Sequence, residues 1–467
     1  MWTYYAIILV TMGIAFYLGF NRKLPVGLVM VIAGAVGLLA SGRGLPIRHM
    51  VEGSFYFLYL MMVIATSVVF ITTLEMSGSF DALTRLLILK LHRTPWALLC
   101  LLMLIVMLPA MLTGSAPVAV LSTGVLVAPI LLRLGIPKIQ TAAILAMGGL
   151  LGQSAPPINV MIMIIATSVF MPYEGFDLPL AILCFPMAAF SVLYLGLRYV
   201  RRETLAEVVK EIESPGSTTS RSPAPPGHGS ATTNAAAGAH GTDPGTLATP
   251  TRSTTSGTPA GWLPFLPLIV LAIFMTGPRA WPTKFVDPGA PLSFTISAIV
   301  ALFTGRRINI IELSRRSMKK ALGVLGLFVG IGVLVQVLSF TGLRGFIAVA
   351  SMAVPRRFLY PFVGITAPLV CGPLVPFGAS AVVGPPFVLA FTDKNSVIIA
   401  SAVSMFLSLG CLVPPTALSG LFGARVVGIE REYGKVFRAC LIPAALTFIE
   451  ALLFMIYANP IGKFLGV

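Results

Sequence analysis

The sequence has little charge and little of the chemistry on which enzymes depend. Charged residues make up only 10% of its 467 residues, against about 25% in a soluble domain. It contains no HExxH, Walker or nucleophile-elbow motif, and its four histidines lie outside the apolar segments. Its five cysteines lie in apolar segments with neither a CxxC spacing nor a paired framework, which is typical of packing residues. We therefore expect a protein that is not an enzyme and that holds no cofactor or metal centre.

Long apolar stretches occupy most of the remaining sequence. Hydrophobic residues make up 57% of the chain, and they recur in runs of about 20 residues, the length that spans a bilayer as a helix. Backbone polar groups in lipid need partners within the protein, so helices or a closed barrel are the two options. Barrel strands alternate polar and apolar residues, whereas residues 96–111 are apolar without alternation. The sequence therefore predicts an all-α polytopic membrane protein.

One long gap in hydropathy runs over residues 201–260. The gap opens with charged residues and continues in Ser, Thr, Pro, Ala and Gly. Such a composition cannot bury a core, so it predicts a disordered linker. The linker divides the hydrophobic chain into two halves, residues 1–200 and residues 261–467.

The two halves carry the same order of interruptions. In the first half, residues 114–119 break an apolar stretch, and residues 152–159 follow with a Pro-Pro pair. In the second half, residues 378–381 break an apolar stretch, and residues 410–416 follow with another pair. A proline inside a span removes a backbone donor and clashes with the preceding turn. Two pairs at matching places favour paired broken helices over a single structural kink.

The number of crossings predicts how the halves are related. We read each long interrupted stretch ahead of the Pro-Pro pair as a re-entrant hairpin, which leaves five spans in each half. An odd number of crossings turns the second half upside-down, so the sequence predicts two inverted repeats. The expected spans are 2–20, 25–41, 54–74, 139–170 and 178–197 with a hairpin at 96–133, and 262–277, 290–304, 321–340, 395–428 and 437–458 with a hairpin at 359–391.

The basic residues set the expected orientation. The formal net charge is +16, and the basic residues cluster in short loops between spans, as at 315–320. Nucleic-acid binding would place them on one soluble face with aromatic residues, so we expect no nucleic-acid partner. Most clusters fall on one side of the predicted topology, which the positive-inside rule makes cytoplasmic. Both termini are then expected outside, and the linker is expected in the cytoplasm.

Each hairpin and each broken span is expected to end two half-helices near the middle of the membrane. New segments would begin after Ser115, Pro157, Gly378 and Pro415, with Ser115 as an N-cap and Pro117 or Pro157 in a first turn. Helix N-termini carry roughly half a positive charge and free N–H groups, which favour an anion. Free carbonyls at the matching C-termini suit a cation such as Na⁺. This geometry supports anion uptake coupled to a cation.

Polar side chains and breakers at these interruptions are the candidate substrate or ion contacts. We favour Ser115, Asn159 and Thr416 as such contacts. For Ser154 and Ser380, a hydrogen bond to the backbone at a helix break is an equal alternative. The whole expected site comprises Gly114, Ser115, Ser154, Pro156, Pro157, Asn159, Gly378, Ser380, Pro414, Pro415 and Thr416.

Glu450 lies near the middle of the last expected span. Away from their ends, the expected spans offer no basic residue to pair with it, and an intramembrane carboxylate is a functional hypothesis by default. A role in ion coupling is one interpretation. A protonated structural group and a contact to another subunit are the alternatives.

With its motifs in this order, the sequence resembles the large membrane subunit of tripartite ATP-independent periplasmic (TRAP) transporters, within the ion-transporter superfamily. The resemblance is carried by residues 114–115, the Ala- and Gly-rich run 142–157, and residues 408–416 and 428–439, followed by a Pro-containing final span. It covers nearly the whole chain outside the linker. The sequence departs from the family in its long linker and in lacking an acidic residue just after the first hairpin tip.

The resemblance implies an elevator mechanism, in which the hairpins and broken helices move as one transport domain against a scaffold of the other spans. It also implies Na⁺ coupling and a carboxylate substrate such as a dicarboxylate. The implied partners are a small membrane subunit and a periplasmic solute-binding protein. The implied location is the cytoplasmic (inner) membrane of a bacterium or archaeon.

Two alternatives remain open on the sequence alone. A stand-alone carboxylate symporter of the same superfamily would need no binding protein. A membrane-embedded enzyme or an assembly subunit belongs to a different class, and a midplane cluster of His, Asp or Cys would favour the enzyme.

Overall fold

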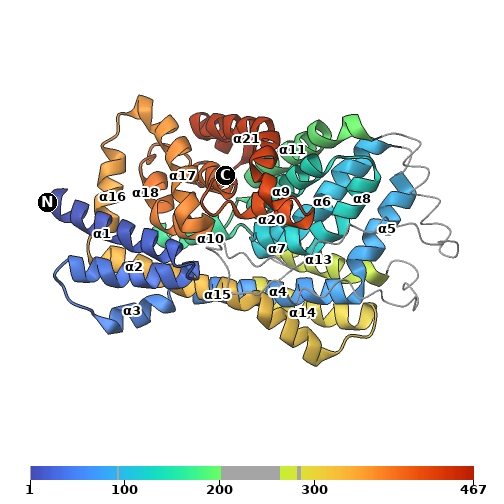
Figure 1. Ribbon diagram of the computed structural model, residues 1–467, viewed down its shortest axis with the longest axis horizontal. Coiled ribbons are helices and arrows are strands. Elements are labelled where there is room, and N and C mark those ends of the chain that lie inside the picture. The colour runs from blue at the N-terminus through green and yellow to red at the C-terminus, as the bar shows by residue number, and fades with distance from the viewer. Residues whose placement is uncertain (1, 92–93, 201–262, 281–285) are drawn as a thin grey trace, which may run out of the picture.

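The computed structural model describes residues 2–91, 94–200, 263–280 and 286–467 (Figure 1). These residues form helices joined by shorter connections, and no strand occurs among them. Eight of the described helical segments are long and apolar enough to cross a membrane, by length and composition. The predicted all-α polytopic membrane protein is confirmed at this level. The expected disordered linker at 201–260 lies outside the described residues.

Helices from both halves of the chain pack into one group, which we call the lower layer because most of it lies along the bottom of Figure 1. Helix α2 packs along α15, and α14 packs along α4, so each half contributes a helix that lies against the other half. The lower layer consists of α1 (Trp2–Asn21), α2 (Val26–Ala40), α3 (Ile47–Ser54), α4 (Leu58–Ser77), α13 (Leu266–Ala280), α14 (Ala290–Thr304) and α15 (Ile310–Phe340).

Glycines allow the backbones of the lower layer to touch. A Cβ atom on Gly27 of α2 would lie 2.4 Å from the carbonyl oxygen of Gly326 of α15, and one on Gly330 would lie 2.2 Å from that of Gly27. A Cβ atom on Gly332 would lie 2.1 Å from the carbonyl oxygen of Gly53 in α3. Only glycine permits these approaches, as in the small-residue contacts of membrane helices. Helix α15 is therefore fixed against α2 and α3.

The remaining long helices form an upper layer around α9 and α19. Residues 141–154 of α9 and 398–409 of α19 are all buried, as expected of helices that are apolar all round and lie at a centre. The upper layer consists of α6 (Pro95–Thr113), α7 (Ala116–Ala119), η1 (Val120–Gly124), α8 (Val125–Arg133), α9 (Lys138–Ser154), α10 (Val160–Val169), α11 (Asp177–Gly196), α17 (Arg356–Val382), α18 (Gly384–Leu389), α19 (Ser396–Leu409), η5 (Gly410–Leu412), α20 (Leu418–Val426), α21 (Tyr433–Ile456) and α22 (Ala458–Leu465).

Two shorter helices connect the layers at opposite ends of the molecule. Figure 1 shows α16 (Leu343–Met352) on the left and α5 (Ser79–Leu91) on the right. A glycine with a left-handed backbone comes just before each connecting helix, Gly78 with φ 78° before α5 and Gly342 with φ 77° before α16. Glycine adopts this conformation at little cost, so the chain can turn sharply out of the lower layer. Short 3₁₀ turns complete the fold at η2 (Leu197–Tyr199), η4 (Leu263–Phe265) and η6 (Glu430–Glu432).

The structure corrects one expected boundary in the lower layer. The span expected at 321–340 is the second part of α15, which begins at Ile310. Asn309 caps this helix, since its Oδ1 accepts a hydrogen bond from the backbone N of Ile311 at 3.0 Å. The expected boundary is wrong because four of the six residues 315–320 are basic, which is typical of a loop between spans. Helix propensity is high for Arg and Lys, so the helix continues through them.

Candidate functional site

The first Pro-Pro pair interrupts a helix, as predicted. Helix α9 ends at Ser154, and α10 begins at Val160 beyond Pro156 and Pro157. Asn159 is the N-cap of α10, and its Oδ1 accepts a hydrogen bond from the backbone N of Ile162 at 3.0 Å. The prediction that Pro157 lies in the first turn of the new helix is wrong. Asn159 satisfies one free N–H group of the first turn, that of Ile162, so the helix starts after it.

The second Pro-Pro pair interrupts a helix in the same way. Helix α19 continues into the short turn η5, the backbone becomes extended at Val413, and α20 begins at Leu418. Both pairs, Pro156-Pro157 and Pro414-Pro415, contain a cis peptide bond. Each half therefore contains one broken helix, as the sequence predicts.

The first hairpin turns where the sequence predicts. Helix α6 ends at Gly114, whose φ of 66° lies in the left-handed region. Ser115 occupies the N-cap position of α7 with an extended backbone, although its side chain makes no capping hydrogen bond. Pro117 lies in the first turn of α7, where its missing N–H costs nothing. The second arm then runs through η1, a π-helical turn, into α8.

The second hairpin turns earlier than predicted. The backbone leaves the helical region at Val375, with φ 52° and ψ 167°, and a second helical arm follows from Pro376. The prediction that a new segment begins after Gly378 is wrong, because Gly378 and Ser380 already lie in that arm. Proline suits the first position of a helix. The prediction placed the turn at Gly378 because glycine is the residue expected at a break, whereas the break lies at Val375.

A buried network of hydrogen bonds joins the two broken helices. Gln153 Nε2 at the end of α9 donates to Ser408 Oγ of α19 at 3.2 Å and to Cys411 Sγ of η5 at 2.9 Å. Asn159 Nδ2 donates to Ser404 Oγ at 3.0 Å. The hydroxyls of Ser154 and Ser408 are also hydrogen-bonded to each other. All of these side chains are at most 1% exposed, so the network is isolated from solvent.

Asn159 has a structural role within this network. Its Nδ2 also donates to the carbonyl oxygen of Ser154 at 3.0 Å, while its Oδ1 caps α10. The amide therefore spends both N–H groups and one acceptor position on the protein. Tyr173 adds a further support, since its Oη accepts a hydrogen bond from the backbone N of Asn159 at 2.8 Å. Hydrogen bonds to Ser154, Ser404 and Tyr173 therefore fix the start of α10.

The first hairpin tip packs directly on the first break. Gln153 Oε1 accepts a hydrogen bond from the backbone N of Ala116 at 3.3 Å. A Cβ atom on Gly114 would lie 2.3 Å from Val160 Cγ2. Near the end of α9, a Cβ atom on Gly152 would lie 2.7 Å from the carbonyl oxygen of Met107 in α6. The hairpin and the broken helix of the first half are therefore in close contact at glycines.

The second hairpin packs on the second break by the same means. Thr416 Oγ1 donates to the carbonyl oxygen of Gly372 in α17 at 2.7 Å. A Cβ atom on Gly372 would lie 2.7 Å from the carbonyl oxygen of Pro414, and one on Gly410 would lie 2.3 Å from Cys371 Cβ. The predicted residues Pro414, Pro415 and Thr416 thus contact the arm that leads to the second hairpin tip.

Two buried residues at these interruptions have strained backbones. Val375, at the second hairpin tip, and Ala417, just before α20, have positive φ angles of 52° and 36°. They are 2% and 1% exposed. A positive φ is rare for a residue with a side chain, and above all for a β-branched one. Strain of this kind costs about 1–3 kcal/mol and concentrates at functional sites.

Three predicted residues take no part in the network or in the contacts of the hairpins with the broken helices. Gly378 faces the lower layer, where a Cβ atom on it would lie 2.5 Å from Met30 Cε of α2. Ser380 Oγ donates to the carbonyl oxygen of Pro376 in its own helix at 2.6 Å, the backbone-bonded alternative. Glu450 is half-buried on α21, and its Oε2 has no hydrogen-bond partner among the described residues.

Sequence reasoning missed Ser404 and Ser408, which complete the network from the α19 side. With Ser401, they recur along one face of an otherwise apolar helix. Single serines in such helices usually bond to the carbonyl one turn earlier, as Ser401 Oγ does with Val397 at 2.8 Å. A polar stripe at helical spacing was the signal that could have identified them.

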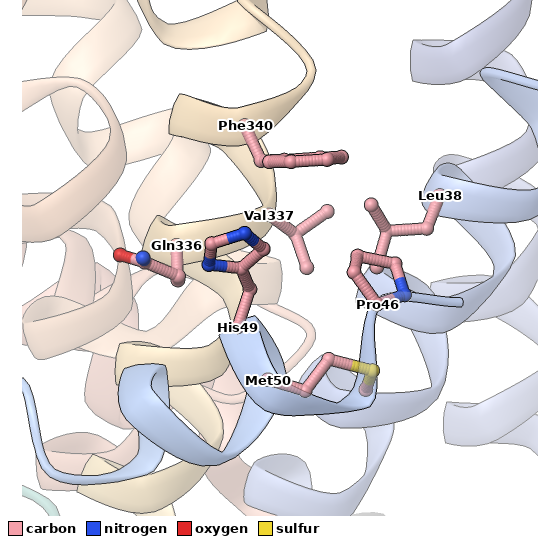
Figure 2. Close-up of a pocket in the computed structure, with 7 residues that line it drawn as sticks. All are labelled: Leu38, Pro46, His49, Met50, Gln336, Val337 and Phe340. Carbon is pink, nitrogen blue, oxygen red and sulfur yellow. The ribbon is translucent and has the colours of Figure 1, made fainter. Parts of the chain in front are cut away.

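Figure 2 shows a small hollow in the lower layer, away from the broken helices. It lies between α2, α3 and α15, and the ring of His49 lies 5.0 Å from that of Phe340. His49 Nδ1 is also 3.2 Å from Glu52 Oε2. Most of the lining is apolar, so this hollow offers little chemistry. Its lining residues are Leu38, Pro46, His49, Met50, Gln336, Val337 and Phe340.

Comparisons with known proteins leave the site as the main guide to function. The chain matches no protein-family model and no curated protein. Within the described part of the chain, no three His, Cys, Asp or Glu side chains gather as a metal site would require. The site consists of backbone breaks, hydroxyls, amides and the thiol of Cys411.

Proposed function

We propose that the chain is a secondary active transporter, the large permease subunit of a TRAP-type system that takes up an organic carboxylate with a cation gradient, with Na⁺ as the coupling ion. The observation that carries the proposal is that two broken helices, one from each half, meet in a buried hydrogen-bond network. Each broken helix also packs against the hairpin of its own half. Irregular backbone at membrane depth is tolerated where it is buried in protein or lines a cavity. Paired discontinuous helices of this kind hold substrate and ions in secondary transporters.

The proposed inverted repeats are supported by the order and exchange of elements. In each half a long helix, a connecting helix, a hairpin, a broken helix and a last long helix follow one another. Helix α2 of the first half lies on α15 of the second, while α14 of the second lies on α4 of the first. Similarly, α10 contacts α17, and α20 contacts α7 and η1. A pseudo-twofold relation between the halves accounts for these reciprocal contacts.

The two layers fit the two parts of an elevator. We assign the lower layer to the scaffold and the upper layer to the transport domain. Close contacts at glycines hold α2 and α3 against α15. A separate set of glycine contacts holds each hairpin against its broken helix. The connecting helices α5 and α16 leave the lower layer at left-handed glycines. Rigid bodies joined by such turns can move relative to one another by changing a few backbone angles.

The proposed substrate and ion contacts are Ser115 and Thr416 with the backbone around them. Ser115 starts a helix without capping it, so its hydroxyl can donate a hydrogen bond to a carboxylate. Thr416 uses its proton on Gly372, which leaves oxygen lone pairs beside the carbonyls of the second break, a set that suits Na⁺. Asn159, Ser154 and Gln153 would hold this arrangement in place.

The test is uptake of labelled carboxylate into liposomes that hold this chain with its candidate small membrane subunit and are supplied with the binding protein, for the wild type and for Ser115→Ala and Thr416→Val. We expect Ser115→Ala to raise the apparent KM for carboxylate and Thr416→Val to raise the Na⁺ concentration for half-maximal rate. Thr447→Val is the matched control, because Thr447 is equally buried and donates within its own helix to Pro443 at 2.9 Å. Unchanged affinities in both site variants would argue against this site.

A further inference from the structure

The first turns of α15 extend beyond the part that a membrane core needs. Helix α15 has 31 residues, which at 1.5 Å per residue is about 46 Å long. A bilayer core is about 30 Å thick, and the apolar residues 321–340 are enough to span it. Residues 310–320 then continue about 16 Å further, into the headgroup region. This segment is a rigid continuation of the helix at the membrane surface.

Its exposed face is divided into two stripes. Ile311, Met318 and Leu322, at spacings that place them on one helical face, are 79%, 61% and 60% exposed. Beside them runs a basic stripe of Arg315, Arg316 and Lys319, all exposed. Leu313, Ser317 and Ala321 form the third side, which is buried. An apolar stripe beside a basic one matches the boundary between acyl chains and phosphates.

The charge of this segment is strongly unbalanced. Residues 306–320 contain six basic residues and a single acid, Glu312. Glu312 is paired with Arg316 at 2.6 Å, and Lys320 is paired with Glu75 of α4. A second basic cluster, residues 425–438, has four basic residues and two acids, with Arg425 paired to Glu430 and Lys435 to Glu432. The surface at 306–320 thus has the larger excess positive charge.

We propose that the first three turns of α15, with the adjoining residues 306 and 307, bind the phosphate headgroup of an anionic phospholipid. Guanidinium groups match phosphate oxygens in geometry and charge, and the stripe of Ile311, Met318 and Leu322 lies where the acyl chains of the same lipid begin. Basic segments next to a spanning helix recognise anionic lipids in this way. The bound lipid would stabilise the position of α15 in the membrane, and α2 and α3 are packed against α15 at glycines. The inference depends on the membrane location alone and is independent of transport.

The test is native mass spectrometry of the full chain in detergent, titrated with phosphatidylglycerol and, separately, with phosphatidylcholine. We expect the wild type to bind phosphatidylglycerol more tightly. The triple variant Arg315→Gln, Arg316→Gln and Lys319→Gln should lose affinity for it by at least ~10-fold, since each charge near a membrane surface contributes about 5-fold. Its affinity for phosphatidylcholine should not change.

A matched control removes the same charge elsewhere. Arg431→Gln, Lys435→Gln and Arg438→Gln should lower the affinity for phosphatidylglycerol less than ~3-fold, because that cluster holds its own acids. The charge-preserving swap Arg315→Lys, Arg316→Lys and Lys319→Arg should retain most of the binding and shows that the segment still folds. Equal binding of both lipids by the wild type, or an equal loss in both triple variants, would overturn the proposal. Displacement of the lipid by equimolar inorganic phosphate would overturn it as well.

Discussion

Gln153 donates a hydrogen bond from Nε2 to Cys411 Sγ across 2.9 Å, so the two broken helices touch at equivalent positions. Each of these residues follows a glycine and precedes a Pro-Pro pair by three positions. Each glycine, Gly152 or Gly410, lies against the hairpin of its own half. The contact between Gln153 and Cys411 is therefore one of the hydrogen bonds that join the two halves of the site, and it joins them at equivalent positions.

Gln153→Leu should destabilise the protein. The substitution keeps the shape of the side chain but leaves Ala116 N and the Ser408 and Cys411 side chains without this partner. A buried polar group left unsatisfied costs about 1–3 kcal/mol, so the thermal unfolding midpoint in detergent should fall. Gln140→Leu on the same helix is the control, because Gln140 makes one part-buried bond to Tyr199 Oη at 3.2 Å. Equal midpoints for the two variants would contradict a special role for the network.

Ala417→Gly should stabilise the protein. Ala417 has φ 36° and ψ 42°, a left-handed conformation that glycine adopts without the steric cost of a Cβ atom. Relief of that cost is worth about 1 kcal/mol. Ala424→Gly, a buried residue in the interior of α20, should have the opposite sign, with a loss of about 0.5–1 kcal/mol. Thermal unfolding of both variants measures the difference, and a loss in both would refute strain at Ala417.

Gly152→Ala and Gly410→Ala should separate the hairpins from the broken helices. The added methyl groups would overlap Met107 O and Cys371 Cβ, at 2.7 Å and 2.3 Å. Overpacking of this kind costs about 1–3 kcal/mol. The same substitution at Gly323 of α15, where a Cβ atom meets nothing within 4 Å, should instead stabilise the helix by about 1 kcal/mol. If all three variants shifted the thermal unfolding midpoint in the same direction, the hairpin contacts would not be tightly packed.

Glu450→Gln should raise stability, whereas Glu75→Gln should lower it. Glu450 Oε2 is buried without a partner among the described residues, and an amide is cheaper to bury than a carboxylate. Glu75 has an ion pair with Lys320, so its neutralisation leaves that cation unpaired.

The same Glu450→Gln variant tests a role of Glu450 in ion coupling. A coupling role predicts that uptake loses its dependence on pH or on the driving ion, and unaltered uptake would exclude that role.

The breaks in the helices could be predicted because proline leaves a strong local signal. A Pro-Pro pair cannot continue a helix, and both pairs interrupt one in the structure. Gly114 was identified for a similar reason, since its left-handed backbone favours glycine. At the second tip the same reasoning failed. Val375 has a backbone that sequence would assign to glycine, and only tertiary packing can hold a valine there.

The partners in the buried network could not be predicted from the sequence. Gln153 and Ser408 are far apart in the chain, and their contact arises because α9 and α19 cross at the centre of the upper layer. Local sequence gives the face on which a serine lies but not the helix that it meets. Asn159 shows the converse. Its position before an apolar run is a signal for a helix cap, which we interpreted as a substrate or ion contact, and the structure uses it as a cap.

The most direct test of the proposed function is reconstitution in liposomes with an imposed inward Na⁺ gradient. Uptake of labelled dicarboxylates such as succinate would be measured for this chain alone, and then with a candidate small membrane subunit and a solute-binding protein loaded with the substrate. The account predicts uptake only when all three proteins and the Na⁺ gradient are present. Robust uptake by the chain alone would contradict the tripartite assignment in favour of a stand-alone symporter. No uptake in any combination, under Na⁺ or H⁺ gradients, would contradict transport itself.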